Sequence, residues 1–107
     1  MLSVITMGKL GVFVCTDKHG EDVEGLVKAA IEKGHEVKVF FTGPGVRLVP
    51  TEHAKEIVRA GATVGMCWHS FEELGLAEKY EVPEGIQKTT QDFNANMMKE
   101  VDRYVVF

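Results

Sequence analysis

The sequence predicts a three-layer α/β/α sandwich built on a parallel sheet of four to five strands. Short apolar runs alternate along the chain with segments of helical spacing, which is typical of βαβ units. The first run, residues 10–16 (LGVFVCT), is apolar almost throughout, as in a strand buried on both faces of a parallel sheet. The length of 107 residues indicates one domain, residues 1–107, in which residues 1–8 are expected to be a loose N-terminal extension.

The first half of the chain supplies a βαβ unit. Residues 23–31 carry apolar side chains at helical spacing, and Gly34 stands where a glycine commonly ends a helix. Residues 37–42 (VKVFFT) are typical of a second strand, and the crossover that joins the two strands is expected to be right-handed. Thr51 is a good N-cap for a second helix, which is expected to stop at Gly61.

The second half continues the alternation with shorter elements. Residues 62–67 (ATVGMC) form the third expected strand, and residues 70–80 form the next helix. A very short fourth strand is expected at residues 85–88, and a last helix is capped by a threonine at residues 89–90. Residues 104–107 close the chain as a strand.

The strands are expected in the flavodoxin-like order 2-1-3-4-5. In such sheets functional groups gather at the carboxyl ends of the strands, near the point where the strand order reverses. Three segments are therefore of interest, which are residues 15–20, 42–46 and 67–70.

Composition argues against several classes of protein. A net charge of −4 argues against a nucleic-acid binder and against an anionic membrane surface as partner. No apolar run approaches the roughly 20 residues that cross a bilayer, and residues 2–7 are too short for the apolar region of a signal peptide. Two cysteines are too few for a disulfide-stapled secreted scaffold. We therefore expect a cytoplasmic protein.

Cys67 is the leading candidate for chemistry. It ends the third expected strand, and a helix is expected to begin directly after it. The free N–H groups and the dipole of a helix N-terminus favour a thiolate, the reactive form of cysteine. His69 can add a positive charge or shuttle a proton, and Gly65 leaves room for a close approach of backbone or ligand. The alternative is that Cys67 is a small buried hydrophobe and His69 an ordinary polar residue.

Residues 61–70 (GATVGMCWHS), followed by residues 74–76 (LGL), resemble the DsrE/DsrF/TusD-like family of small sulfur-relay proteins. Residues 29–45 (AAIEKGHEVKVFFTGPG) are similar as well, and the resemblance covers residues 10–107. It implies a flavodoxin-like sheet and a homo-oligomer, which can be a dimer, trimer or hexamer. It also implies that Cys67 carries sulfur as a persulfide between donor and acceptor proteins of the TusA-like or rhodanese-like kind, without a cofactor.

Other polar residues are expected at the same edge of the sheet. In the expected order the first and third strands are neighbours, so Cys15 is a candidate to resolve an oxidised or persulfidated Cys67. We prefer the alternative that Cys15 packs in the core. Asp17 and His19 are expected to line the cleft of Cys67, and Ser70 closes the motif. The cysteines and nearby histidines lack the usual spacings of zinc ligands, so no metal is expected.

Three functions from different classes fit these residues. The leading one is a sulfur carrier that acts through Cys67, and whether the transfer makes the protein a sulfurtransferase enzyme is left open. The main rival is a small Cys–His hydrolase, because a strand–Cys–helix turn is similar to the nucleophile elbow of α/β enzymes. The third is a non-catalytic oligomeric interaction module of the same fold.

Overall fold

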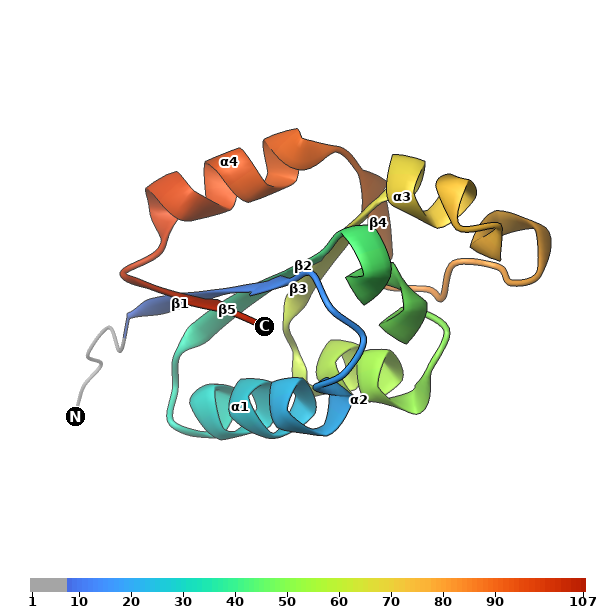
Figure 1. Ribbon diagram of the computed structural model, residues 1–107. Coiled ribbons are helices and arrows are strands. Elements are labelled where there is room, and N and C mark those ends of the chain that lie inside the picture. Colours follow the sequence, from blue (N-terminus) through green and yellow to red (C-terminus); the bar gives the residue numbers. More distant parts are fainter. Residues whose placement is uncertain (1–7) are drawn as a thin grey trace.

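The computed structural model describes residues 8–107, which contain a five-stranded, fully parallel sheet (Figure 1). The strands are β1 (Lys9–Val14), β2 (Glu36–Phe41), β3 (Thr63–Cys67), β4 (Ile86–Thr89) and β5 (Arg103–Val106). The predicted α/β class is confirmed, and the short fourth strand is present. The expected N-terminal extension, residues 1–8, lies outside the described residues except for Gly8.

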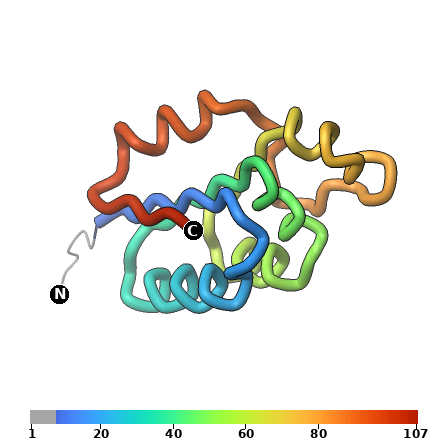
Figure 2. The backbone as a smooth tube through the Cα atoms, in the orientation of Figure 1, coloured from blue at the N-terminus to red at the C-terminus, as the bar shows by residue number. Residues whose placement is uncertain are grey.

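Helices cover both faces of this sheet, which gives the expected three layers. The helices α1 (Gly20–Glu32) and α2 (Glu52–Ala60) lie side by side on one face, and α4 (Gln91–Glu100) crosses the other face (Figures 1 and 2). The short helix α3 (Trp68–Glu73) contacts the 3₁₀ helix η1 (Gly43–Leu48), and a second 3₁₀ helix, η2 (Leu76–Glu78), follows α3. Within residues 8–107, none of the helices combines the length and apolar character needed to cross a bilayer.

The predicted strand order 2-1-3-4-5 is wrong, although the architecture is flavodoxin-like. The observed order is β4-β3-β2-β1-β5. The chain moves in one direction across the sheet from β1 to β4, and α4 then returns it to the far edge, where β5 pairs with β1 (Figure 1). As a result β3 is flanked by β2 and β4, and β1 is not its neighbour.

The return of the chain depends on two glycines that let α4 lie close to the sheet. A Cβ atom at Gly65 in β3 would lie 2.8 Å from the ring of Phe93. A Cβ atom at Gly11 in β1 would lie 3.1 Å from the side chains of Met97 and Val101. The start of α4 therefore rests on β3 and its end on β1, which brings the chain to the edge beside β1. Periodicity predicts an amphipathic helix here but not the strands on which it rests.

The hydrophobic core has two unequal parts. The larger part lies between the sheet and the layer of α1 and α2, and includes the fully buried Val12 and Val39. The smaller part lies under α4 and consists of Phe40, Cys67 and Met97, with partly buried aromatic side chains around them. Because both faces of the central strands are covered, their sequences are apolar runs rather than alternating patterns. Cys67 belongs to the smaller part of the core, on the face of the sheet that α4 covers.

The helix predicted over residues 70–80 is divided in the structure. It begins earlier, at Trp68, and its α-helical part ends at Glu73. Gly75 has a φ of +75°, a left-handed conformation that a helix interior does not contain, and η2 follows it. The second helix, by contrast, begins after Thr51 and stops at Gly61, as predicted, and Gly61 has a φ of +112°. Thr51 occupies the N-cap position, but its hydroxyl donates to the carbonyl oxygen of Leu48 over 2.6 Å instead of capping the helix.

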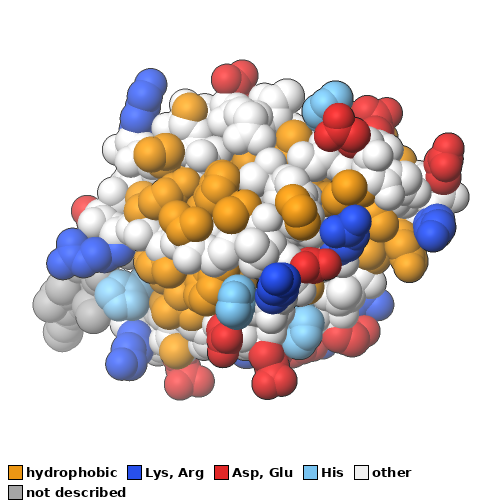
Figure 3. All heavy atoms as spheres, in the orientation of Figure 1, with side chains coloured by type: hydrophobic (Ala, Val, Ile, Leu, Met, Phe, Trp, Pro, Cys, Tyr) orange, Lys and Arg blue, Asp and Glu red, His pale blue; other side chains and the backbone are white. Residues whose placement is uncertain are grey.

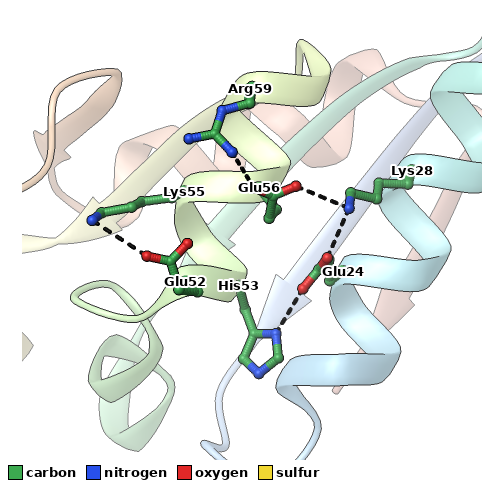
Figure 4. A network of polar contacts seen from close by, with 7 residues as sticks. All are labelled: Glu24, Lys28, Glu52, His53, Lys55, Glu56 and Arg59. Carbon is green, nitrogen blue, oxygen red and sulfur yellow. Dashed lines mark hydrogen bonds and ion pairs between the residues drawn. The ribbon is translucent and has the colours of Figure 1, made fainter.

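The outer surfaces of α1 and α2 are joined by a network of polar contacts (Figure 4). The Nζ atom of Lys28 lies 2.8 Å from a carboxylate oxygen of Glu24 and 3.1 Å from one of Glu56. The Nδ1 atom of His53 lies 2.7 Å from the other oxygen of Glu24, and Arg59 pairs with Glu56. Side-chain hydrogen bonds with Lys28 and His53 lower the pKa of Glu24. This carboxylate therefore links the two helices while it is ionised.

We expect Glu24→Gln to lower the thermal unfolding temperature at neutral pH. Because the pKa of Glu24 is lower in the folded state, its stabilising contribution is complete above the unfolded value, about 4.3, and is lost as the pH falls through the folded value. Calorimetry at neutral and acidic pH should show a difference from the wild type that shrinks in acid. Glu52→Gln, which removes only an exposed 3.5 Å contact with Lys55, is the control and should change little. A difference that grows in acid would contradict this role of Glu24.

Candidate functional site

Cys67 occupies the structural position that the sequence predicted for it. It is the last residue of β3 and the N-cap residue of α3, which begins at the next residue. Cys67 is 6% exposed, and it lines an open hollow of about 380 Å³ together with Ser70, Thr90 and Gln91. The thiol is therefore recessed in the surface, where a small group on a projecting side chain can reach it.

The surroundings of Cys67 favour its thiolate form. Burial, the largest single influence, raises the pKa of the Cys67 thiol. Hydrogen bonds from the hydroxyl and the backbone N–H of Ser70, from the Gln91 amide and from the Thr42 hydroxyl act in the opposite direction. Together these donors outweigh burial, and the pKa of Cys67 lies below its ordinary value. A thiolate is the form of cysteine that acts as a nucleophile.

Neighbouring hydrogen bonds orient these donors toward the sulfur. The backbone N–H of Gly43 donates to the Ser70 hydroxyl oxygen over 3.0 Å, which leaves the hydroxyl proton of Ser70 available for the sulfur. The Nε2 atom of Gln91 donates to the Thr42 hydroxyl oxygen over 2.9 Å. The remaining amide proton of Gln91 and the hydroxyl proton of Thr42 are then available to Cys67. The three side chains thus form a connected set of donors.

The loop after β2, residues 42–46, is one of the three segments predicted from the sequence to be of interest, and it is part of this set. It forms η1, which passes over the end of β1. A Cβ atom at Gly45 would lie 2.2 Å from the carbonyl oxygen of Val14, so this close approach requires glycine. The approach fixes the start of η1 and, with it, Thr42 and the N–H of Gly43.

Sequence reasoning singled out neither Thr42 nor Gln91. It included Thr42 only within residues 42–46 because it placed β1 rather than β2 beside β3, and it placed β4 beside β3 correctly without considering the residues that follow that strand. Thr42 directly follows β2, and Gln91 begins the helix that follows β4. Since β2 and β4 flank β3, the carboxyl ends of all three strands meet at Cys67. The rule that functional groups lie at these ends applies here, but it needs the correct neighbour of β3 before it selects Thr42.

The predicted approach of Cys15 to Cys67 rests on the wrong strand order. β2 lies between β1 and β3, so the two strands are separated by two strand spacings, roughly 10 Å. A disulfide needs Cα atoms within about 7 Å, and both cysteines are free thiols. Cys15 is half-buried, and its Sγ atom donates to the carbonyl oxygen of Phe107 over 3.3 Å.

Asp17 and His19 lie in the loop after β1, on the side of Cys15. Asp17 faces Arg47 at 3.8 Å, and the Nδ1 atom of His19 lies 3.6 Å from the carboxylate of Asp22. Neither residue lines the hollow of Cys67. The same change of strand order that moves Cys15 away moves this loop away as well.

His69 lines the hollow, but its side chain is 81% exposed and faces Glu73, with its Nε2 atom 3.6 Å from the carboxylate. It is not among the groups that lower the pKa of Cys67. Ser70, the other polar residue of the motif, supplies both a hydroxyl and a backbone N–H. Of the two, Ser70 has the more direct contact with the sulfur.

The described part of the chain contains no group of three or more His, Cys, Asp or Glu side chains placed to hold a metal ion. The donors around Cys67 are hydroxyl and amide groups, which suit an anionic sulfur rather than a soft metal. The arrangement can therefore hold and present a thiolate or a small anionic group attached to it.

Comparison with known proteins places the chain in a family. A model of the DsrE/DsrF-like family matches residues 9–107, and the chain belongs to this family. The resemblance read from residues 61–70 is thereby confirmed. No curated protein sequence matches the chain.

Two solved structures share the fold. The ychN protein from E. coli superposes with a TM-score of 0.79 at 14% identity, and the match covers 94% of this chain and 100% of that one. A conserved protein of unknown function, BT1422 from Bacteroides thetaiotaomicron, gives a TM-score of 0.72 at 18% identity over 94% of this chain and 95% of that one. At these identities the likeness concerns the fold alone.

We expect Ser70→Ala to raise the pKa of Cys67, because it removes a hydroxyl that stabilises the thiolate and leaves the backbone N–H in place. Iodoacetamide alkylation of Cys67, followed by mass spectrometry from pH 5 to 10 (roughly the range in which thiols titrate), should show a midpoint moved to higher pH. Ser70→Thr keeps the hydroxyl and is the matched control. Equal midpoints for wild type and Ser70→Ala would mean that this hydroxyl does not act on the sulfur.

Proposed function

Because the chain belongs to the DsrE/DsrF-like family, we propose that it is a sulfur carrier in which Cys67 accepts and passes on a sulfane sulfur. One observation supports this role above the others. The Cys67 thiol lines an open hollow, and hydrogen bonds from Ser70, Gln91 and Thr42 lower its pKa. A carrier needs a thiolate that can be reached, and little else.

The transfer is a thiolate exchange that needs no oxidant, reductant or cofactor. The Cys67 thiolate attacks the outer sulfur of a donor protein's persulfide, and a new S–S bond forms to Cys67. The S–S bond of the donor breaks at the same time, and the donor leaves as a thiolate. In the second step an acceptor thiolate attacks the outer sulfur on Cys67, and Cys67 leaves as a thiolate. The proton of the persulfide stays with the outer sulfur throughout.

The donors around Cys67 serve both steps. In the first step they increase the fraction of thiolate available for attack. In the second step they stabilise the same thiolate as a leaving group, and a thiol of lower pKa leaves faster. A side chain that only packed in the core would gain nothing from these contacts.

The shape of the site agrees with protein partners rather than a small substrate. The hollow is open, and Cys67 is recessed in it at 6% exposure. A persulfide on a projecting segment of a partner can enter it, and we propose donor and acceptor proteins of the TusA-like or rhodanese-like kind. Two free thiols suit action in a reducing compartment, the cytoplasm.

The rival Cys–His hydrolase lacks support at the sulfur. A hydrolase of that class needs a base within hydrogen-bond reach of its nucleophile. Within residues 8–107, no histidine contributes to the lowered pKa of Cys67, and the nearby His69 faces Glu73 instead. The hydroxyl and amide donors stabilise a thiolate, but they do not take up a proton.

We also infer that the chain associates with itself through the face that carries α4 and the edge strand β5. β5 pairs with β1 alone, Val106 on β5 is 57% exposed, and Met98 on α4 is 55% exposed. An edge strand with exposed apolar side chains is a surface that proteins normally cover or protect with charge. A second copy is the occupant that we propose.

Sedimentation velocity of the full chain should give a species heavier than the monomer, and Val106→Lys should move it toward the monomer. The added ammonium places a charge on the edge strand, as natural edge strands do to prevent pairing. Leu74→Lys, which changes an apolar residue of 36% exposure in the α3–η2 region, is the control. A wild type that stays monomeric at all concentrations would contradict this association.

Incubation with a persulfide donor should add the mass of one sulfur atom to the intact protein. Cys67→Ser should abolish the adduct, while Cys15→Ser should retain it, because Cys15 lies two strands away. A thiol of the acceptor class should then remove the added sulfur. An adduct that persists in Cys67→Ser would contradict the proposed role, and hydrolysis of activated esters without any adduct would favour the hydrolase.

A further inference from the structure

We propose that the protein has a second site, separate from Cys67, that binds a fatty acid or a similar amphipathic carboxylate between β1, β5 and α1. The site is a hollow with a volume of about 600 Å³. Its floor includes Leu10 of β1 and Leu26 and Ala29 of α1, and Lys33 and Arg103 stand at its rim. Ligand pockets commonly have volumes of about 300–1,000 Å³.

The apolar floor is a consequence of the strand order. α1 packs against β1 and β2, whereas β5 is added at the outer edge by the return of α4 on the opposite face. Within residues 8–107, no helix therefore covers the α1 side of β5, and Leu10 and Leu26 are partly exposed. Figure 3 shows apolar side chains gathered between β5 and α1, with basic side chains at the end nearer the N-terminus.

Positive charge is concentrated at this hollow although the chain as a whole is negative. Lys33 is the C-cap residue of α1, and Arg103 lies opposite Leu10 in the β1–β5 register. Neither forms an ion pair with a described acidic residue. The acidic group at the rim, Asp102, accepts a hydrogen bond from the backbone N–H of Lys9 over 2.8 Å. The guanidinium of Arg103 donates only to the backbone carbonyl oxygen of Asp102, over 3.2 Å, among its described contacts. Against a net charge of −4, two cations without a described carboxylate partner beside an apolar floor favour an anionic ligand.

The combination of floor and rim indicates the ligand class. A simple anion such as phosphate would pair with the cations but would leave the apolar floor exposed to water. A neutral hydrocarbon would cover the floor but would not pair the positive charges of Lys33 and Arg103. An alkyl chain that ends in a carboxylate satisfies both, and the planar guanidinium of Arg103 matches a carboxylate in two parallel hydrogen bonds.

The site is remote from the chemistry proposed for Cys67. Lys9 and Leu10 begin β1 and Arg103 begins β5, whereas Cys67 ends β3. In a parallel sheet the first and last residues of the strands lie at opposite ends of the sheet. Occupancy of one site therefore does not require occupancy of the other. Binding there is independent of whether Cys67 carries sulfur.

The test is an NMR titration of the ¹⁵N-labelled full chain with decanoate, decanol and decyltrimethylammonium, each below its micelle concentration. We expect decanoate to bind most tightly and to shift the amides of Leu26, Ala29 and Ala30, which line the hollow. Decanol should bind more weakly, and the cation most weakly, because the three ligands have alkyl chains of similar length and only decanoate has an anionic head group.

Two variants separate the contributions of the rim and the floor. Lys33→Glu combined with Arg103→Glu should weaken decanoate binding by about tenfold or more, since both head-group contacts become repulsive. Lys79→Glu combined with Lys99→Glu changes the net charge equally at residues outside the hollow and is the matched control. Ala29→Leu should block the floor while it preserves the cations, because Ala29 is an exposed helical residue that tolerates leucine.

Three results would overturn the proposal. They are equal affinities for the three head groups, amide shifts confined to residues outside the hollow, and no binding of decanoate up to its solubility limit. Cys67 alkylation measured in the same samples should be unaffected by decanoate, which keeps this test separate from that of the sulfur carrier.

Discussion

The contact between Phe93 and Gly65 is the constraint on which the site depends. Because Gly65 has no side chain, the ring of Phe93 lies directly on β3, where a Cβ atom would be 2.8 Å from it. That contact fixes the first turn of α4 over β3 and places Gln91 beside Cys67. The same helix then crosses to Gly11 and delivers β5 to the sheet edge. One packing arrangement thus sets both the strand order and the polar shell of the thiol.

The state of Cys67 is a balance of two opposing influences rather than a property of its position alone. Burial under α4 disfavours the charged sulfur, as it does for an inert core cysteine. Hydroxyl and amide groups held by Ser70, Thr42 and Gln91 reverse that preference. These groups are oriented by their own hydrogen bonds, so little reorganisation is needed when the sulfur becomes charged. The site is therefore suited to a thiolate both as nucleophile and as leaving group.

The two ends of the parallel strands differ in chemical character. At the carboxyl ends of the strands, polar groups from three neighbouring strands surround a single thiol. At the amino-terminal ends, an apolar floor is bordered by Lys33 and Arg103. Both features follow from the strand order. It places β2 and β4 on either side of β3, and it places β5 at an outer edge, where none of the described helices covers its α1 side.

The sequence by itself determined the α/β class, the strands, the ends of α2 and the placement of Cys67 between a strand and a helix. These features depend on local patterns, such as apolar runs, Thr51 and Gly61 as helix ends, and the glycine-rich family motif. Only the tertiary structure decided the strand order, and with it the separation of Cys15 from Cys67 and the position of Thr42 beside the thiol; it also decided that the start of α4 brings Gln91 to the same sulfur. The physical reason is that strand order depends on which strands a crossing helix can approach closely. That approach is set by contacts between residues far apart in the chain, which periodicity does not encode.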